Sequence, residues 1–90
     1  MSEKVRIVAV AARSNLLGFL YALPKPSRHS DLISETTKSG FLWSGFTAGF
    51  LTNEGRFVDR DKAWYIAAAA GQILPRDDLT PGTLYSEDLW

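Results

Sequence analysis

The chain has no cysteine and only one histidine among its 90 residues. The lack of cysteine excludes disulfide bonds, thiol nucleophiles and cysteine metal sites, and it agrees with a reducing compartment such as the cytoplasm. One histidine and scattered carboxylates match no recognised ligand spacing. We therefore expect no metal and no other cofactor.

The chain also lacks an excess of charge of either sign and a long hydrophobic run. Ten Lys and Arg residues balance ten Asp and Glu residues, and the pI is about 6.5. Because non-specific nucleic-acid binding usually needs a broad basic field, we expect no DNA or RNA partner. The apolar run Val5–Ala12 is too short to cross a bilayer, contains Arg6, and lacks the layout of a signal peptide. We expect no membrane association.

The composition of the chain is that of one small globular domain covering residues 1–90. Hydrophobic residues make up 46% of the chain and charged residues 22%, which is far from the composition of disordered proteins. A domain of this size buries only about 60% of the surface that its unfolded chain exposes. Its stability margin is therefore thin, and we expect a homodimer or a higher homo-oligomer.

The first third of the chain predicts a strand pair followed by a helix. Lys4–Arg13 and Leu17–Leu23 are rich in β-branched, aromatic and alanine residues, and the turn formers between them favour an antiparallel hairpin. Prolines end the second strand, and Ser27 is a good N-cap for a helix over Arg28–Ser39, with Gly40 as its stop.

The remainder predicts a second hairpin and a second helix. Asn53–Gly55 suits a tight turn between strands at Gly49–Thr52 and Arg56–Val58. Asp59 is the expected N-cap of an alanine-rich helix that Gly71 closes. The predicted fold class is α+β, a small antiparallel sheet of about four strands with two helices packed on one face.

Several strings in the second half of the chain resemble a family of short proteins encoded by tailed phages. They are Gly49–Thr52 (GFLT), Gly55–Arg60 (GRFVDR), the helix end around Gly71, and Leu84–Trp90 (LYSEDLW). Their order and spacing are more specific than any one of them. Similar proteins carry Arg-His-His-Asp where this chain has Arg28–Asp31 (RHSD), so this chain lacks the second histidine that a two-histidine chemistry would need.

This resemblance implies an accessory role in the cytoplasm of an infected host. Some small phage proteins counter host defence by sequestering nucleotide immune signals in pockets between identical subunits. By analogy, we expect this chain to bind and hold a nucleotide-like small molecule, such as an ADP-ribose conjugate from a TIR-type enzyme or a cyclic dinucleotide.

Arginines near the two predicted helix starts are the candidate phosphate-binding residues. Arg28 and His29 open the first helix, where free backbone amides favour an anion. Arg56 and Arg60 flank the start of the second helix, although they suit ion pairs with Asp59, Asp61 or the acidic tail equally well.

Aromatic and amide side chains near the C-terminus are the candidate base-binding residues. Tyr85 and Trp90 offer flat faces for stacking, and the amide of Gln72 can read a base edge. The alternative for the tail is that it folds back over the core or a partner subunit, and the alternative for Gln72 is a helix cap.

We expect a binding protein rather than an enzyme. Two alternatives stay open: a phosphodiesterase in which His29 works with a carboxylate such as Asp31, and a non-enzymatic inhibitor that binds a host protein.

Overall fold

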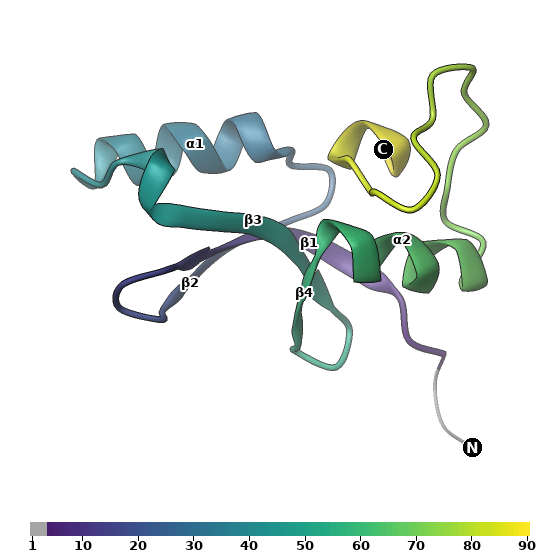
Figure 1. The fold of residues 1–90 in the computed structure, drawn as a ribbon, viewed down its shortest axis with the longest axis horizontal. Helices are drawn as coiled ribbons and strands as arrows, with labels where there is room; N and C mark the ends of the chain where they lie inside the picture. Colours follow the sequence, from purple (N-terminus) through teal and green to yellow (C-terminus); the bar gives the residue numbers. More distant parts are fainter. Residues whose placement is uncertain (1–3) are drawn as a thin grey trace.

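The computed structural model describes residues 4–90 and contains one four-stranded sheet with two α-helices (Figure 1). In chain order the elements are β1 (Ile7–Ser14), β2 (Leu20–Pro24), α1 (His29–Lys38), a 3₁₀ turn (Trp43–Gly45), β3 (Phe46–Thr52), β4 (Phe57–Asp59), α2 (Arg60–Ala69) and a second 3₁₀ turn (Ser86–Asp88). The strands are antiparallel in the order β2-β1-β3-β4, so β2 and β4 are the two edges.

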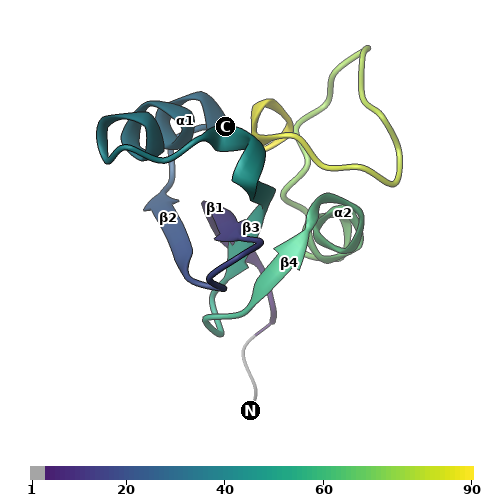
Figure 2. The ribbon, with the colours of Figure 1, turned by 60° about the vertical axis from the view of Figure 1, so that its left-hand side comes forward.

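Both helices cover the same face of the sheet, which confirms the predicted fold class (Figure 2). Val10, Phe50 and Val58 lie side by side on β1, β3 and β4, and all three are buried. Leu32 of α1 and Ala63 of α2 belong to the same hydrophobic cluster as this row. Burial of this one apolar face against both helices is the main favourable term in folding.

The start of α2 agrees with the sequence prediction, whereas the start of α1 differs by one residue. Asp59 is the N-cap of α2 and accepts a hydrogen bond from the Lys62 amide at 2.8 Å. In α1 the N-cap is Arg28 rather than Ser27. The reason is that the Asp31 carboxylate reaches back and accepts from the Arg28 amide at 2.8 Å, which satisfies this end of the helix.

The second strand begins at Leu20 rather than at the predicted Leu17, because the connection after β1 is longer than a tight turn. The Leu17 amide donates to the Ser14 hydroxyl at 3.1 Å, and the Gly18 amide donates to the Ser14 carbonyl at 2.9 Å. These local bonds hold the chain in a turn before it can pair with β1.

The tail after α2 returns to the sheet and completes the core. The Leu74 amide donates to the Asp88 carbonyl at 2.8 Å, and the Leu84 amide donates to the Arg60 carbonyl at 2.9 Å. Leu84 and Leu89 are buried in the same cluster as Phe50. Within residues 4–90 no helix has the length and apolar character that a membrane crossing needs.

Candidate functional site

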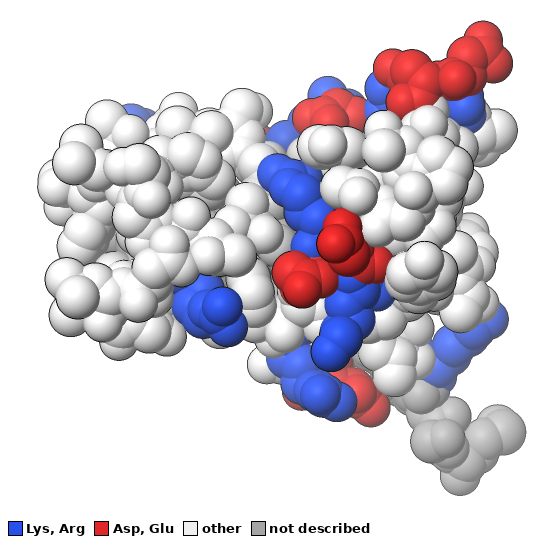
Figure 3. Space-filling model, in the orientation of Figure 1, with Lys and Arg blue, Asp and Glu red and all other residues white. Residues whose placement is uncertain are grey.

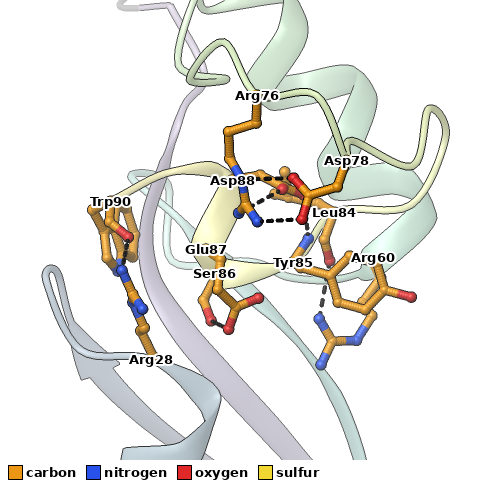
Figure 4. A network of polar contacts seen from close by, with 10 residues as sticks. All are labelled: Arg28, Arg60, Arg76, Asp78, Leu84, Tyr85, Ser86, Glu87, Asp88 and Trp90. Carbon is orange, nitrogen blue, oxygen red and sulfur yellow. Dashed lines mark hydrogen bonds and ion pairs between the residues drawn. The ribbon is translucent and has the colours of Figure 1, made fainter.

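Five of the seven candidate residues lie around the second 3₁₀ turn, where the beginnings of both helices face the C-terminal tail. Arg28 and His29 come from the start of α1, and Arg60 is the first residue of α2. Tyr85 and Trp90 flank the second 3₁₀ turn, which lies between the two helix starts (Figures 1 and 4). The tertiary fold thus joins residues that are more than fifty positions apart in the chain; we call them the tail cluster.

His29 is the buried member of the tail cluster. Its residue is only 7% exposed, its Nε2 lies 2.8 Å from the Gly49 carbonyl oxygen, and its ring meets Phe50 edge-on at 4.9 Å. Its Nδ1 is buried and has no hydrogen-bond partner within the part of the chain that the structure describes. Burial, followed by the positive charge of Arg60, lowers the pKa of His29 from 6.5 to about 4. The imidazole is therefore neutral at neutral pH.

Arg60 is a half-buried cation that no carboxylate of residues 4–90 pairs with. Its Nη1 donates to the Leu84 carbonyl at 3.0 Å, and its guanidinium lies over the Tyr85 ring, 4.9 Å from the centroid. Among residues 4–90, ion pairs are formed by Arg76 alone. Burial lowers the pKa of Arg60, although Tyr85, Glu87 and Asp88 act in the opposite direction. Arg60 is still charged, because a guanidinium is effectively always protonated in proteins.

Arg28 and Trp90 tie the last residue of the tail to the segment before α1. The Arg28 Nη2 donates to the Trp90 carbonyl at 2.7 Å, and the Trp90 indole Nε1 donates to the Ser27 carbonyl at 2.7 Å. Figure 4 shows the Arg28 side chain extended toward Trp90. Part of the donor capacity of Arg28 is thus used within the chain, and the indole fixes the tail rather than standing free.

A polar network centred on Asp88 and Arg76 fixes the shape of the second 3₁₀ turn (Figure 4). The Asp88 carboxylate is buried; it accepts from the Tyr85 amide at 2.9 Å and from Arg76 Nη1 at 3.3 Å. Arg76 also pairs with the exposed Asp78 at 2.9 Å. Sequence analysis missed Arg76, whose proximity to Asp88 depends on how the connecting loop folds.

Arg56 and Gln72 lie outside the tail cluster. Gln72 pairs with the main chain of Ile7: its Oε1 accepts from the Ile7 amide and its Nε2 donates to the Ile7 carbonyl, both at 2.8 Å. Arg56 lines an open cavity of about 200 Å³ beside β4, together with Lys62. A second cavity of about 250 Å³ also includes Lys62, with Arg13 and Phe57. Sequence analysis did not single out Lys62, although its place in the first turn of α2, close to Arg56, was a usable signal.

Charged side chains are distributed unevenly over the surface (Figure 3). Residues 14–24 and 39–50 contain no Asp, Glu, Lys or Arg, and we call this region the uncharged end. In Figure 3 it lies in the nearly white left half, and charged side chains of both signs form a stripe beside that half. Leu16, Leu17 and Leu42 in this region are 90%, 66% and 80% exposed.

The side chains of the tail cluster are suited to binding an anion and stacking on a ring rather than to acid–base catalysis. The ring of His29 bonds to a main-chain carbonyl, while Asp31 is occupied by the Arg28 amide. A general acid–base histidine must reach its substrate and have a pKa near the working pH, and a buried imidazole with a pKa of about 4 does neither. No group of three possible metal ligands occurs among residues 4–90.

Comparison with known proteins gives one match that covers nearly the whole chain. The model of the family described as phage T4 y16D protein matches residues 6–90. Searches of curated proteins and of solved structures gave no match. The matched range includes both helices, all four strands and the tail cluster. The expected resemblance to a small phage protein family is therefore confirmed, and the chain belongs to the phage T4 y16D protein family.

Proposed function

We propose that this protein is a phage accessory factor that binds and sequesters a small anionic, nucleotide-derived signal of host defence in the host cytoplasm. The tail cluster is the site: Arg60 and Arg28 engage phosphate, and Tyr85 lies against the base or ribose. The protein holds its ligand and does not cleave it.

The observation that carries this proposal is the half-buried guanidinium of Arg60. Within residues 4–90 its single hydrogen bond is to the Leu84 carbonyl, and none of the carboxylates in that range lies within ion-pair distance. A buried charge is costly unless it is paired, and a guanidinium presents donors that match phosphate oxygens in a bidentate way. A bound anion would therefore pair with a guanidinium that is already partly desolvated and needs little reorganisation.

The neighbouring side chains add the aromatic component of such a site. Tyr85 is 41% exposed, and one face of its ring already lies against the Arg60 guanidinium, 4.9 Å from the centroid. Aromatic stacking on a base is worth about 1–3 kcal/mol. Glu87, also exposed, offers an acceptor for a base amine or a ribose hydroxyl.

The environment of His29 supports binding without cleavage. A phosphodiesterase mechanism requires the imidazole to exchange a proton with the substrate. Here the imidazole is neutral at neutral pH, and its two nitrogens lie against the sheet or in the protein interior. His29 therefore acts as a structural residue beneath the site.

A thermal-shift titration with ADP-ribose, cyclic ADP-ribose, a cyclic dinucleotide and pyrophosphate tests the proposal. A ligand at a hundred times its Kd adds about 2.7 kcal/mol of apparent stability. We expect one of the nucleotides to raise Tm and to be recovered intact after denaturation. We expect Arg60→Met, which keeps the aliphatic stem, to lose this ligand-induced shift.

Two further variants make the test specific. Arg6→Met removes an exposed cation outside the tail cluster and is expected to keep the ligand-induced shift. His29→Gln removes the imidazole and is expected to leave the recovered ligand unchanged. Conversion of excess nucleotide by the wild type but not by His29→Gln would establish the phosphodiesterase instead. The absence of a shift with every probe would exclude nucleotide sequestration.

A second candidate, an inhibitor that binds a host protein, is favoured by the exposed leucines of the uncharged end. Leu16 and Leu42 are 90% and 80% exposed, and they border an apolar hollow of about 260 Å³. Exposed apolar patches commonly mark protein interaction sites. Leu16→Ser with Leu42→Ser would abolish inhibition of a host protein and leave the nucleotide titration unchanged, so the two candidates are separable.

A further inference from the structure

The edge strand β2 has a free side that nothing in the described chain covers. It pairs with β1 through Leu20–Pro24, and the sheet order places no strand beyond it. In Figure 2 β2 lies at the outer side of the sheet, with α1 above one face and no segment next to its edge. An exposed strand edge is a template for pairing with another strand.

The register identifies which main-chain groups of β2 point outward. The Ser14 amide donates to the Phe19 carbonyl at 2.8 Å, and the Lys25 amide donates to the Val8 carbonyl at 3.2 Å. Hydrogen-bonded pairs alternate along an antiparallel ladder, so the odd-numbered residues of this segment bond toward β1. Leu20 and Ala22 therefore direct both their amide and carbonyl groups away from the sheet, and Pro24 directs its carbonyl.

The side chains along this edge do not block pairing. Natural edge strands are commonly protected by charged residues, by bulges or by prolines within the strand. Residues 14–24 contain no charged residue, and the register between β1 and β2 is unbroken from Ala9 to Arg13. Pro24 is the last residue of the strand, so it removes only one outward donor, at the end.

We propose that two copies of this chain pair through their β2 edges, antiparallel, about a two-fold axis that passes beside Ala22. In this arrangement Ala22 of each copy exchanges two hydrogen bonds with Ala22 of the other. Leu20 of each copy donates to Pro24 of the other, which adds two more hydrogen bonds. The two four-stranded sheets become one eight-stranded sheet.

A second copy fits this edge better than an unrelated charged surface does. The edge and the adjoining uncharged end carry no charge, and covering them with a charged surface would bury unpaired ions at a cost. A two-fold axis instead brings uncharged β2 against uncharged β2, and such isologous contacts are the commonest in homo-oligomers. This interface is on the opposite edge from β4 and does not use the residues of the tail cluster.

The axis position gives a charge-swap test at a single residue. Ala22 is exposed, so replacing it adds a side chain without filling the core. Because position 22 faces itself across the axis, Ala22→Lys and Ala22→Glu each place like charges opposite one another. We expect each homodimer to be weakened about fivefold relative to wild type, and an equal mixture of the two variants to form a heterodimer tighter than either. Sedimentation velocity at matched concentrations measures all three.

A disulfide test supplements the swap and does not require charged substitutions. The chain has no cysteine, so Ala22→Cys introduces a single thiol next to its own copy. Residues in a hydrogen-bonded antiparallel pair have Cα atoms about 5.5 Å apart, which is within disulfide range. We expect rapid oxidation to a covalent dimer of about twice the 10.0 kDa chain mass. The control Leu74→Cys, 43% exposed in the tail, should form no covalent dimer under the same conditions.

Three results would overturn the proposal. The first is a monomeric wild type at about 100 µM in sedimentation. The second is a wild-type dimer that Ala22→Lys leaves as tight as before. The third is an Ala22→Cys protein that crosslinks no faster than Leu74→Cys.

Discussion

The tail over residues 72–90 and the uncharged end contact the rest of the molecule in opposite ways. In the tail, polar atoms have partners inside the chain, as shown by Asp88 with Arg76 and by Trp90 with Ser27. In the uncharged end, apolar side chains such as Leu16 and Leu42 extend into solvent. The tail therefore contributes to the folded core despite its polar sequence, whereas the uncharged end supplies Phe50 to the core but leaves several of its apolar side chains in solvent.

The largest expected effect separates a buried tail leucine from an exposed one. Leu84→Ala removes a side chain with 0% exposure and leaves a cavity, so it should lower the free energy of unfolding by about 2–5 kcal/mol. Leu42→Ala, at an 80% exposed position, should change it by no more than about 0.5 kcal/mol. Urea denaturation of both variants measures the difference. Equal losses of unfolding free energy would show that the tail leucine packs no better than the exposed one.

The next effect is the pH dependence contributed by His29. Its pKa is about 4 in the folded protein and 6.5 in the unfolded chain, so between these values the unfolded state binds more protons. His29 makes its full contribution to the free energy of unfolding above pH 6.5. This contribution falls by roughly 3 kcal/mol as the pH drops to 4.

The variant His29→Gln isolates this contribution, because glutamine does not titrate and can still donate to the Gly49 carbonyl. Denaturation midpoints measured from pH 4 to pH 8 should fall more steeply on the acid side for wild type than for the variant. Parallel curves would show that the imidazole is accessible in the folded protein and that the tail does not seal it.

The smallest effect compares two carboxylates that share one arginine. Asp88→Asn weakens the buried contact with Arg76 and should cost about 1–3 kcal/mol of unfolding free energy. Asp78→Asn removes the exposed partner of the same arginine and should cost about 0–1 kcal/mol. Raising the salt concentration should reduce the second cost more than the first. A larger cost for Asp78→Asn than for Asp88→Asn would mean that the exposed ion pair stabilises the tail more than the buried contact does.

The elements that sequence analysis predicted best are those with local signals. The second helix has its N-cap at Asp59, its alanine face, and Gly71 with a positive φ of 69° just after its end. These cues act within one or two turns of chain, so they can be read without knowledge of the fold. The turn before β2 was misplaced because Ser14 bonds to Leu17 through its side chain, and many sequences can make or omit that bond.

The candidate site was predictable only in its residue types. Arg28, His29, Arg60, Tyr85 and Trp90 were selected for chemistry, and the structure brings them together in the tail cluster. Their roles were not predictable, since nothing local indicates that the ring of His29 turns inward to a strand carbonyl. Gln72 is similar: its amide pairs with a residue 65 positions away.

The sequence by itself determined the composition of the core, the helix and strand types, and the absence of charge from residues 14–24 and 39–50. Only the tertiary structure decided that these two segments form one end of the molecule, that β2 is an edge, and that the polar tail closes over both helix starts. The physical reason is that periodicity, capping and charge pattern act between near neighbours in the chain. Burial of His29 and the position of Arg60 depend instead on contacts between segments that meet only after folding.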